Sequence, residues 1–231
     1  MNAPMRRIRS FEWVCSLMLL TVLACSHAKK KEAEVPVTPE SNTELLEKIC
    51  SLGNKTKRVS GSLWMKTVAE GKSAQFPATV QATAPDQVQM EVTNALGGTE
   101  AWIEVKGGHF DVKLPEGKGQ GVSGKDHWKG IPLRWAPALF LAQIPCPETK
   151  LRVGAKITRE KDNQLSVIAG VDRFLYEGDC SGAVPEIKSL RWEKGGKSVN
   201  FSWPGGYRWE AKSPLGEVKI RWNERDVEEK K

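Results

Sequence analysis

Residues 87–105 read QVQMEVTNALGGTEAWIEV, and this stretch decides the fold. Apolar and polar side chains alternate on both sides of the central Gly97-Gly98 pair, which is typical of a turn between two strands. A period of two places one face of each strand against a core and the other in water, as in an antiparallel sheet. The stretch therefore predicts a β-hairpin with one apolar face. Its apolar positions are Val88, Met90, Val92, Ala101, Ile103 and Val105.

The same pattern continues on both sides of this hairpin. Turn signals rich in glycine, proline and aspartate separate the runs. The sequence predicts ten or eleven strands in a row, and a meander of that length must curl or close. The further predicted strands cover residues 75–82, 109–114, 151–158, 165–176, 187–192, 198–203, 207–212 and 218–222.

Two short helices are expected beside these strands. Ser41 and Glu44 have the spacing of a capping box, and Gly53 ends the apolar helix that they begin. A glycine-rich polar loop, residues 117–130, leads into the second helix, residues 136–142. This helix is apolar on nearly every side, so we expect it to be buried or to cover an opening.

The first 24 residues have the features of a secretion signal. Three arginines precede an apolar run of about twelve residues, too short for a membrane-spanning helix, which needs about 20. The run ends in Val22-Leu23-Ala24-Cys25, which resembles a bacterial lipobox. That resemblance implies cleavage before Cys25 and attachment of acyl chains such as palmitate to this cysteine. An ordinary signal followed by a chance cysteine is the alternative.

The expected organisation follows from this signal. Residues 1–24 are the signal peptide, residues 25–40 are the lipidated cysteine with a flexible linker, and residues 41–231 are a single domain. Two or more acyl chains anchor a protein stably, so membrane lipid is a partner through Cys25. Ser26 after the cysteine favours the outer membrane, with the domain facing the periplasm.

Charge and cysteine content limit the remaining possibilities. Cleavage removes three arginines and one glutamate, so the formal net charge falls from +7 to +5. The remaining cations are scattered, which excludes nucleic acid as the expected partner of an exported domain. Three cysteines remain, Cys50, Cys146 and Cys180, and they cannot all pair. Cys146 with Cys180 is the favoured disulfide, and three buried thiols are the equal alternative.

No motif indicates catalysis, a metal site or a cofactor. Residues 119–124, GQGVSG, fit a dinucleotide-binding pattern formally, but they lack the strand–turn–helix context that this pattern requires. The histidines are expected to be solvated. The eight tryptophans after residue 24 suit a half-buried sheet, as core or cavity lining, and a sugar-stacking platform is the alternative.

The hairpin of residues 87–105 resembles the LolB family of outer-membrane lipoprotein receptors. That family has a T-N-P-L-G-x-T-E turn between two strands, and Ala95 replaces its proline here. A second, weaker match is Gly130-Ile131-Pro132-Leu133 with the later Ile144-Pro145. The resemblance covers most of residues 41–203. The residues that match the turn motif are Thr93, Asn94, Leu96, Gly97, Thr99 and Glu100.

The resemblance implies a mainly β fold of LolA/LolB type: a curled antiparallel meander forming an open, incomplete β-barrel covered by helices. It implies a monomeric receptor, not an enzyme, that takes lipoproteins from a periplasmic LolA-like carrier and inserts them into the outer membrane. Leu96 and Gly97 are the expected membrane-insertion loop, and an apolar cavity would hold the clients' acyl chains. The candidate cavity and lid residues are Leu45, Leu46, Ile49, Met90, Val92, Ile103, Leu139, Phe140 and Leu141.

Two departures from the family keep other functions open. Residues 204–231 extend beyond the family's usual end, and its pattern does not include the cysteines. A lipid-binding or structural envelope lipoprotein without transfer activity is therefore the second hypothesis. A glycan-acting envelope enzyme that uses the tryptophans as a platform is the third.

Overall fold

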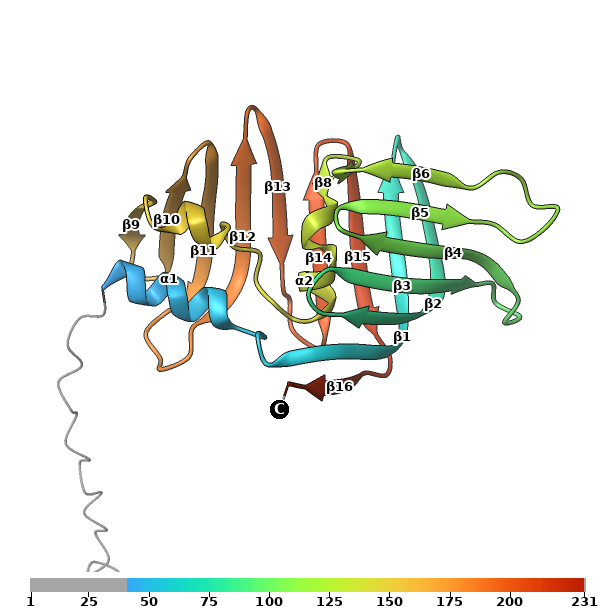
Figure 1. The fold of residues 1–231 in the computed structure, drawn as a ribbon, viewed down its shortest axis with the longest axis horizontal. Coiled ribbons are helices and arrows are strands. Elements are labelled where there is room, and N and C mark those ends of the chain that lie inside the picture. Colours follow the sequence, from blue (N-terminus) through green and yellow to red (C-terminus); the bar gives the residue numbers. More distant parts are fainter. Residues whose placement is uncertain (1–40, 231) are drawn as a thin grey trace, which may run out of the picture. The chain divides into compact units, whose positions relative to one another are not determined.

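One large antiparallel sheet dominates the computed structural model, which describes residues 41–230 (Figure 1). Its strands follow the order β6-β5-β4-β3-β2-β1-β15-β14-β13-β12-β11-β10-β9, and β16 pairs with β1. The first six strands are β1 (Thr56–Ala69), β2 (Lys72–Thr83), β3 (Gln87–Thr93), β4 (Thr99–Lys106), β5 (His109–Lys113) and β6 (Val122–Lys125). The others are β9 (Lys156–Lys161), β10 (Gln164–Ala169), β11 (Asp172–Asp179), β12 (Glu186–Lys194), β13 (Lys197–Ser202), β14 (Arg208–Ser213), β15 (Gly216–Trp222) and β16 (Asp226–Glu229).

The sheet consists of two meanders joined in its middle. Strands β1–β6 form one and β9–β15 form the other, and the first strand of one pairs with the last strand of the other. In this pairing Leu63 lies opposite Trp222, and Met65 lies opposite Ile220. Strands β3–β6 run across the direction of β10–β15 (Figure 1), so the sheet curls without closing. The expected open, incomplete barrel with few short helices is confirmed.

Gly61 marks the point where β1 changes partners from β15 to β16. A side chain at this position would meet the backbone of the connection between those strands, because an added Cβ would lie 2.2 Å from the carbonyl oxygen of Glu224. The close approach therefore requires glycine at residue 61.

Short helices cover the inner face of the sheet. The first, α1 (Asn42–Ser51), has the expected capping box: Ser41 Oγ accepts from the backbone N–H of Glu44, and Glu44 Oε2 accepts from that of Ser41. The other helices are the 3-10 turn η1 (Leu133–Trp135), α2 (Ala136–Phe140) and α3 (Thr149–Arg152). A two-stranded ribbon, β7 (His127–Trp128) and β8 (Ile131–Pro132), precedes η1. No helix within residues 41–230 has the length and apolar character needed to cross a membrane.

The structure corrects several predicted elements. Residues 151–158 are not one strand, because α3 precedes β9, and residues 165–176 are two strands separated at Gly170-Val171. The glycine-rich loop contains β6. Strand β1 was not predicted, because Ser60-Gly61-Ser62 interrupts its alternation. The expected strands of residues 207–212 and 218–222 are confirmed as the hairpin β14–β15, and this hairpin lies in the middle of the sheet. The expected signal peptide, Cys25 and linker lie outside the described residues.

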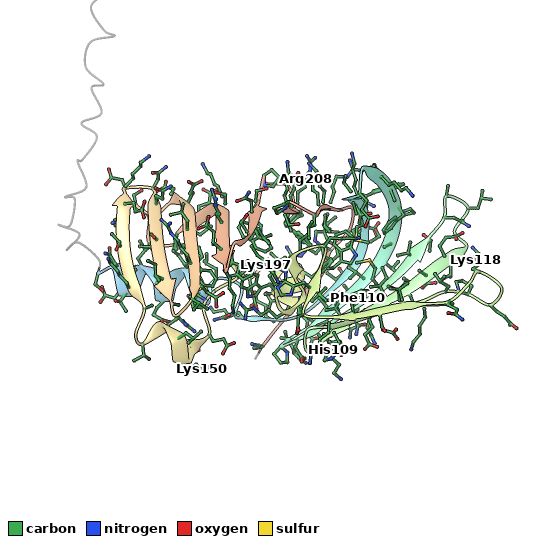
Figure 2. The ribbon with its side chains drawn as sticks, turned by 90° about the horizontal axis from the view of Figure 1, so that it is seen from above. His109, Phe110, Lys118, Lys150, Lys197 and Arg208 are labelled. Carbon is green, nitrogen blue, oxygen red and sulfur yellow. A yellow bond between two sulfur atoms is a disulfide. The ribbon has the colours of Figure 1, made fainter. Side chains whose placement is uncertain are left out.

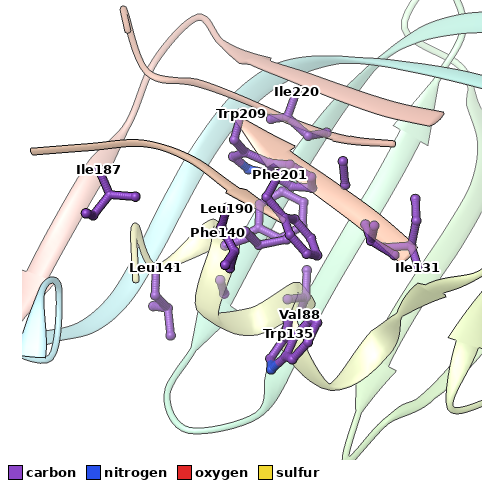
Figure 3. Packing of buried hydrophobic residues seen from close by; sticks show 14 of the residues in the cluster. Val88, Ile131, Trp135, Phe140, Leu141, Ile187, Leu190, Phe201, Trp209 and Ile220 are labelled. Carbon is purple, nitrogen blue, oxygen red and sulfur yellow. The ribbon is translucent and has the colours of Figure 1, made fainter. Parts of the chain in front are cut away.

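Aromatic side chains fill the core beside β11–β13. Figure 3 shows Trp135 and Phe201 among the buried residues of the core. The Trp135 ring packs edge-on against Phe174, Trp192 and Phe201, with ring centroids 5.1–5.9 Å apart. The polar atoms in this region have partners: Trp192 Nε1 donates to Asp172 at 2.9 Å, and the Tyr176 hydroxyl donates to the Pro145 carbonyl at 3.1 Å. Complete burial raises the pKa of Tyr176 well above its usual range.

The disulfide joins Cys50 to Cys146, so the favoured Cys146–Cys180 pairing is wrong. Helix α1 packs beside β9, with Asn42 bonded to the Ile157 carbonyl and Glu47 to Arg152, and this placement brings Cys50 next to the segment after α2. The two Cα atoms lie 5.8 Å apart. Cys180 is a buried thiol at the end of β11.

We expect the Cys50→Ala/Cys146→Ala double variant to lose about 4 kcal/mol of unfolding free energy. The reason is that the disulfide closes a loop with a sequence separation of 96 residues, and loops of this size restrict the unfolded chain strongly. Urea denaturation with and without reductant measures this loss. Reductant should lower the unfolding free energy of the wild type and leave that of the variant unchanged. Equal unfolding free energies of the variant and the oxidised wild type would contradict the expectation.

Candidate functional site

An apolar cavity of about 290 Å³ lies between the segment β7–η1–α2 and the inner face of the sheet. Strands β1–β5 form one wall, and β14 and β15 form the other. The curl of the sheet therefore creates the cavity, because β5 and β14 are far apart in the strand order. The lining residues are Met65, Thr67, Phe76, Val88, Met90, Ile103, Val105, Phe110, Val112, Trp128, Ile131, Pro132, Leu133, Ala136, Leu139, Phe140, Trp209, Ala211 and Val218.

No charged side chain lines this cavity. Its polar side-chain atoms are the Thr67 hydroxyl and the indole nitrogens of Trp128 and Trp209. An unpaired charge would be costly in such surroundings, so the cavity suits a neutral, largely hydrocarbon ligand.

The cavity has a buried side and a half-exposed side. Phe140 and Trp209 are almost fully buried, and their rings pack edge to face with centroids 5.2 Å apart. Ile103, Phe110 and Val112, on β4 and β5, are only half-buried. Phe110 faces the interior whereas its neighbour His109 is exposed (Figure 2). Access to the cavity is therefore expected along β4 and β5.

The covering segment, residues 126–146, is held at both ends. At its beginning, the Lys129 carbonyl accepts a hydrogen bond from the Ser213 hydroxyl, and the Lys129 ammonium pairs with Glu70. At its end, the disulfide attaches Cys146 to α1. Residues 126–146 thus form a lid whose middle part, η1 and α2, lies over the apolar wall.

The structure brings four of the predicted cavity residues together at this site: Met90 and Ile103 from the sheet, and Leu139 and Phe140 from the lid. The other five do not line it. Leu45, Leu46 and Ile49 are buried under α1, which packs beside β9, while Val92 and Leu141 are buried in the core. Sequence reasoning did not select Trp209 and Ala211, because nothing local shows that β14 faces β3–β5 across the curl.

The predicted insertion loop lies at the turn between β3 and β4. The Leu96 side chain is 97% exposed there, and Gly97 adopts a positive φ of 82°. Asn94 organises the turn, because its side-chain oxygen accepts from the backbone N–H groups of Leu96 and Gly98, each at 2.9 Å. The turn therefore holds a large apolar side chain in water.

Glu100 fixes Asn94 from the next strand. Its carboxylate accepts from Asn94 Nδ2 at 2.8 Å and pairs with Lys118 at 2.6 Å. The bond from Lys118 contributes most, and that from Asn94 next, to lowering the pKa of this exposed carboxylate. Lys118 belongs to the β5–β6 loop, so a cation stands at the same end of the sheet as the Leu96 turn (Figures 1 and 2).

A second hollow, of about 740 Å³, lies on strands β1–β5, and most of its lining residues are polar or charged. Across these strands Gln81, Gln89, Glu104 and Asp111 are successive cross-strand neighbours. Trp102 is 45% exposed here. Of the other tryptophans in the described part of the chain, four are buried and three half-buried. All of these except the half-buried Trp64 belong to the core or pack against it, so the core or cavity interpretation holds for six of the eight.

The fold and this cavity define a class: a curled, unclosed antiparallel sheet that surrounds an apolar site beneath a helical lid. No protein-family model and no curated protein sequence matches the chain.

Solved structures do match it. A putative outer membrane lipoprotein-sorting protein domain from Vibrio parahaemolyticus superposes with a TM-score of 0.50 at 9% identity, over 81% of this chain and 94% of that one. A LolA-superfamily protein from Nitrosomonas europaea has a TM-score of 0.48 at 11% identity, over 83% and 96%. A DUF1329 family protein from Desulfovibrio piger has a TM-score of 0.47 at 9% identity, over 81% and 92%. The chain shares the fold of the Vibrio sorting domain.

We expect Ala136→Phe to weaken binding of a neutral lipid such as monopalmitoylglycerol by at least about tenfold. Ala136 lines the cavity from α2, so a phenyl ring there occupies space that the ligand needs. Ala138→Phe is the matched control, because Ala138 lies on the same helix outside the lining. Calorimetric titration of the three proteins measures the difference. Equal affinities would show that lipid does not use this cavity.

Proposed function

We propose that this protein is a lipoprotein of the outer membrane, anchored through Cys25 and facing the periplasm, that receives client lipoproteins from a LolA-like carrier and inserts them into the membrane. In this proposal the clients' acyl chains lie in the apolar cavity. The observation that carries it is a cavity of about 290 Å³ without a charged side chain, beneath a short helical lid. Such a site favours hydrocarbon, and the protein acts by binding rather than as an enzyme.

The size of the cavity suits transient holding. It lies at the lower end of ligand sites, which span about 300–1,000 Å³, so it shelters part of one acyl chain. Each buried CH₂ group contributes about 0.8 kcal/mol. A bilayer buries the whole acyl chain, whereas the cavity buries only part of it. Transfer to the membrane is then favourable without a nucleotide.

The Leu96 turn supports delivery to a bilayer. A nearly fully exposed leucine on a hydrogen-bonded turn gains about 1.5–3 kcal/mol when it enters an apolar phase. Lys118, held near the turn by Glu100, would meet anionic headgroups. We propose Leu96 and Gly97 as the part of the domain that enters the membrane.

A lipid-binding lipoprotein without transfer activity is the second candidate. It is favoured by the lid, which a disulfide fixes at one end and Ser213 and Glu70 at the other, because exchange of a client requires the lid to move. Incubation of the soluble domain, residues 40–231, with a carrier–lipoprotein complex distinguishes the two, since only a receptor removes the client from its carrier. This segment is a compact unit with its own core.

We expect Leu96→Glu to reduce transfer of a lipoprotein from the soluble domain into liposomes by about tenfold or more, because a charged turn cannot enter hydrocarbon. Leu215→Glu is the matched control: Leu215 is 64% exposed and lies in the β14–β15 turn. Both variants should keep the wild-type melting temperature and affinity for monopalmitoylglycerol. Unchanged transfer by Leu96→Glu, or equal losses in both variants, would remove the insertion role.

A further inference from the structure

One buried polar group in the cavity has no partner. Trp209 is 7% exposed, and its Nε1 is covered by neighbouring atoms and makes no hydrogen bond within residues 41–230. Leaving a buried N–H unpaired costs free energy, and buried tryptophans usually find an acceptor. Trp192 shows the usual case, because its buried Nε1 donates to Asp172.

The surroundings of Trp209 distinguish it from the other buried side-chain nitrogens without a hydrogen bond among the described residues, Arg152 Nε and Arg225 Nε. Arg152 still uses both terminal nitrogens, which donate to Glu47 and Thr149. Arg225 is only half-buried, and its guanidinium lies over the rings of Tyr207 and Trp222. The side chain of Trp209, in contrast, carries a single N–H and lines the apolar cavity.

We propose that the Trp209 indole N–H binds the carbonyl oxygen of an ester- or amide-linked acyl chain in this cavity. This inference rests on the proposed lipid-binding function and specifies its ligand. A carbonyl supplies the missing acceptor on a molecule that is otherwise hydrocarbon. A free fatty acid fits less well, because no cation lines the cavity to compensate a carboxylate.

The position of Trp209 indicates how the ligand would be oriented in the cavity. Of the two cavity residues on β14, Trp209 is the one next to the β13–β14 loop, and both Tyr207 of this loop and Arg208 at the start of β14 are exposed. A carbonyl at Trp209 therefore lies on the buried side of the cavity, and a headgroup attached to it reaches water past the β13–β14 loop. The chain then extends past Ala211 and the lid toward Phe110.

The Phe140 ring offers a different explanation of why the Trp209 N–H has no hydrogen-bond acceptor. The two rings are perpendicular, with an interplanar angle of 86°, and an indole N–H pointing at an aromatic face makes a weak contact. In that case the N–H has no role in recognising a ligand, and esters and ethers of equal chain length would respond alike to its removal.

The test compares ligands that differ at one carbonyl. The probes are monopalmitoylglycerol (an ester), N-palmitoylethanolamine (an amide) and hexadecylglycerol (an ether). Each probe is titrated against three forms of the soluble domain: the wild type, the Trp209→Phe variant and the Trp128→Phe variant. Trp128→Phe is the matched control, because it removes a half-buried indole N–H from the same cavity.

We expect Trp209→Phe to reduce the affinity for the ester and for the amide by about fivefold more than the affinity for the ether. The void left by the smaller ring affects all three probes, so the ratio of affinities isolates the hydrogen bond. Trp128→Phe should leave the ratio unchanged. A selective loss for only the ester or only the amide would identify which linkage the site takes.

A measurement on the wild-type domain covers the case in which Trp209→Phe does not fold. The Trp209 indole proton resonance should move downfield with ester or amide and not with ether. A ratio and a resonance that do not distinguish ester from ether would overturn the inference while leaving lipid binding intact. Failure of all three probes to bind the wild type would instead overturn the proposed function.

Discussion

The pairing of β1 with β15 is the constraint on which the rest of the structure depends. It joins two antiparallel meanders that are separate in sequence, and it runs from Leu63 opposite Trp222 to Ala69 opposite Gly216. Because β1 also pairs with β2 along most of its length, its direction sets the position of β2–β6 relative to β10–β15. The curl that results leaves apolar faces opposite each other across a space. The cavity is therefore a property of the whole sheet rather than of one motif.

The two halves of the interior differ in how completely they are filled. Beside β11–β13, Trp135 and its aromatic neighbours interlock, and the polar atoms of Trp192 and Tyr176 are paired. Beneath α2 the lining is equally apolar, yet space remains and Trp209 keeps an unpaired N–H. Close packing is the rule for protein interiors, so a space bounded by a lid and half-exposed side chains indicates a site for a ligand.

Local patterns in the sequence predicted the local structure, and contacts between distant segments account for what they missed. The hairpin of residues 87–105 and the helix after Ser41 depend on alternation and capping within a few residues, and both formed as expected. Strand β1 depends on a partner about 150 residues away, and Ser60-Gly61-Ser62 hides it from any pattern of period two. Cys50 meets Cys146 only because α1 packs beside β9. In the same way, Met90 and Leu139 could be selected for the cavity, whereas Trp209 could not.

An unclosed sheet has a further consequence, at its two edges. Strands β9 and β6 each present backbone N–H and C=O groups on one side with no neighbouring strand in the described part of the chain, and such edges are templates for aggregation. Strand β9 reads KITREK, so its cations and its glutamate oppose stacking against another copy. Strand β6 has only four residues and includes Gly124, too short and irregular for a stable addition. The sheet can therefore stay unclosed, as its cavity requires, without presenting a long, flat edge to a second copy of the chain.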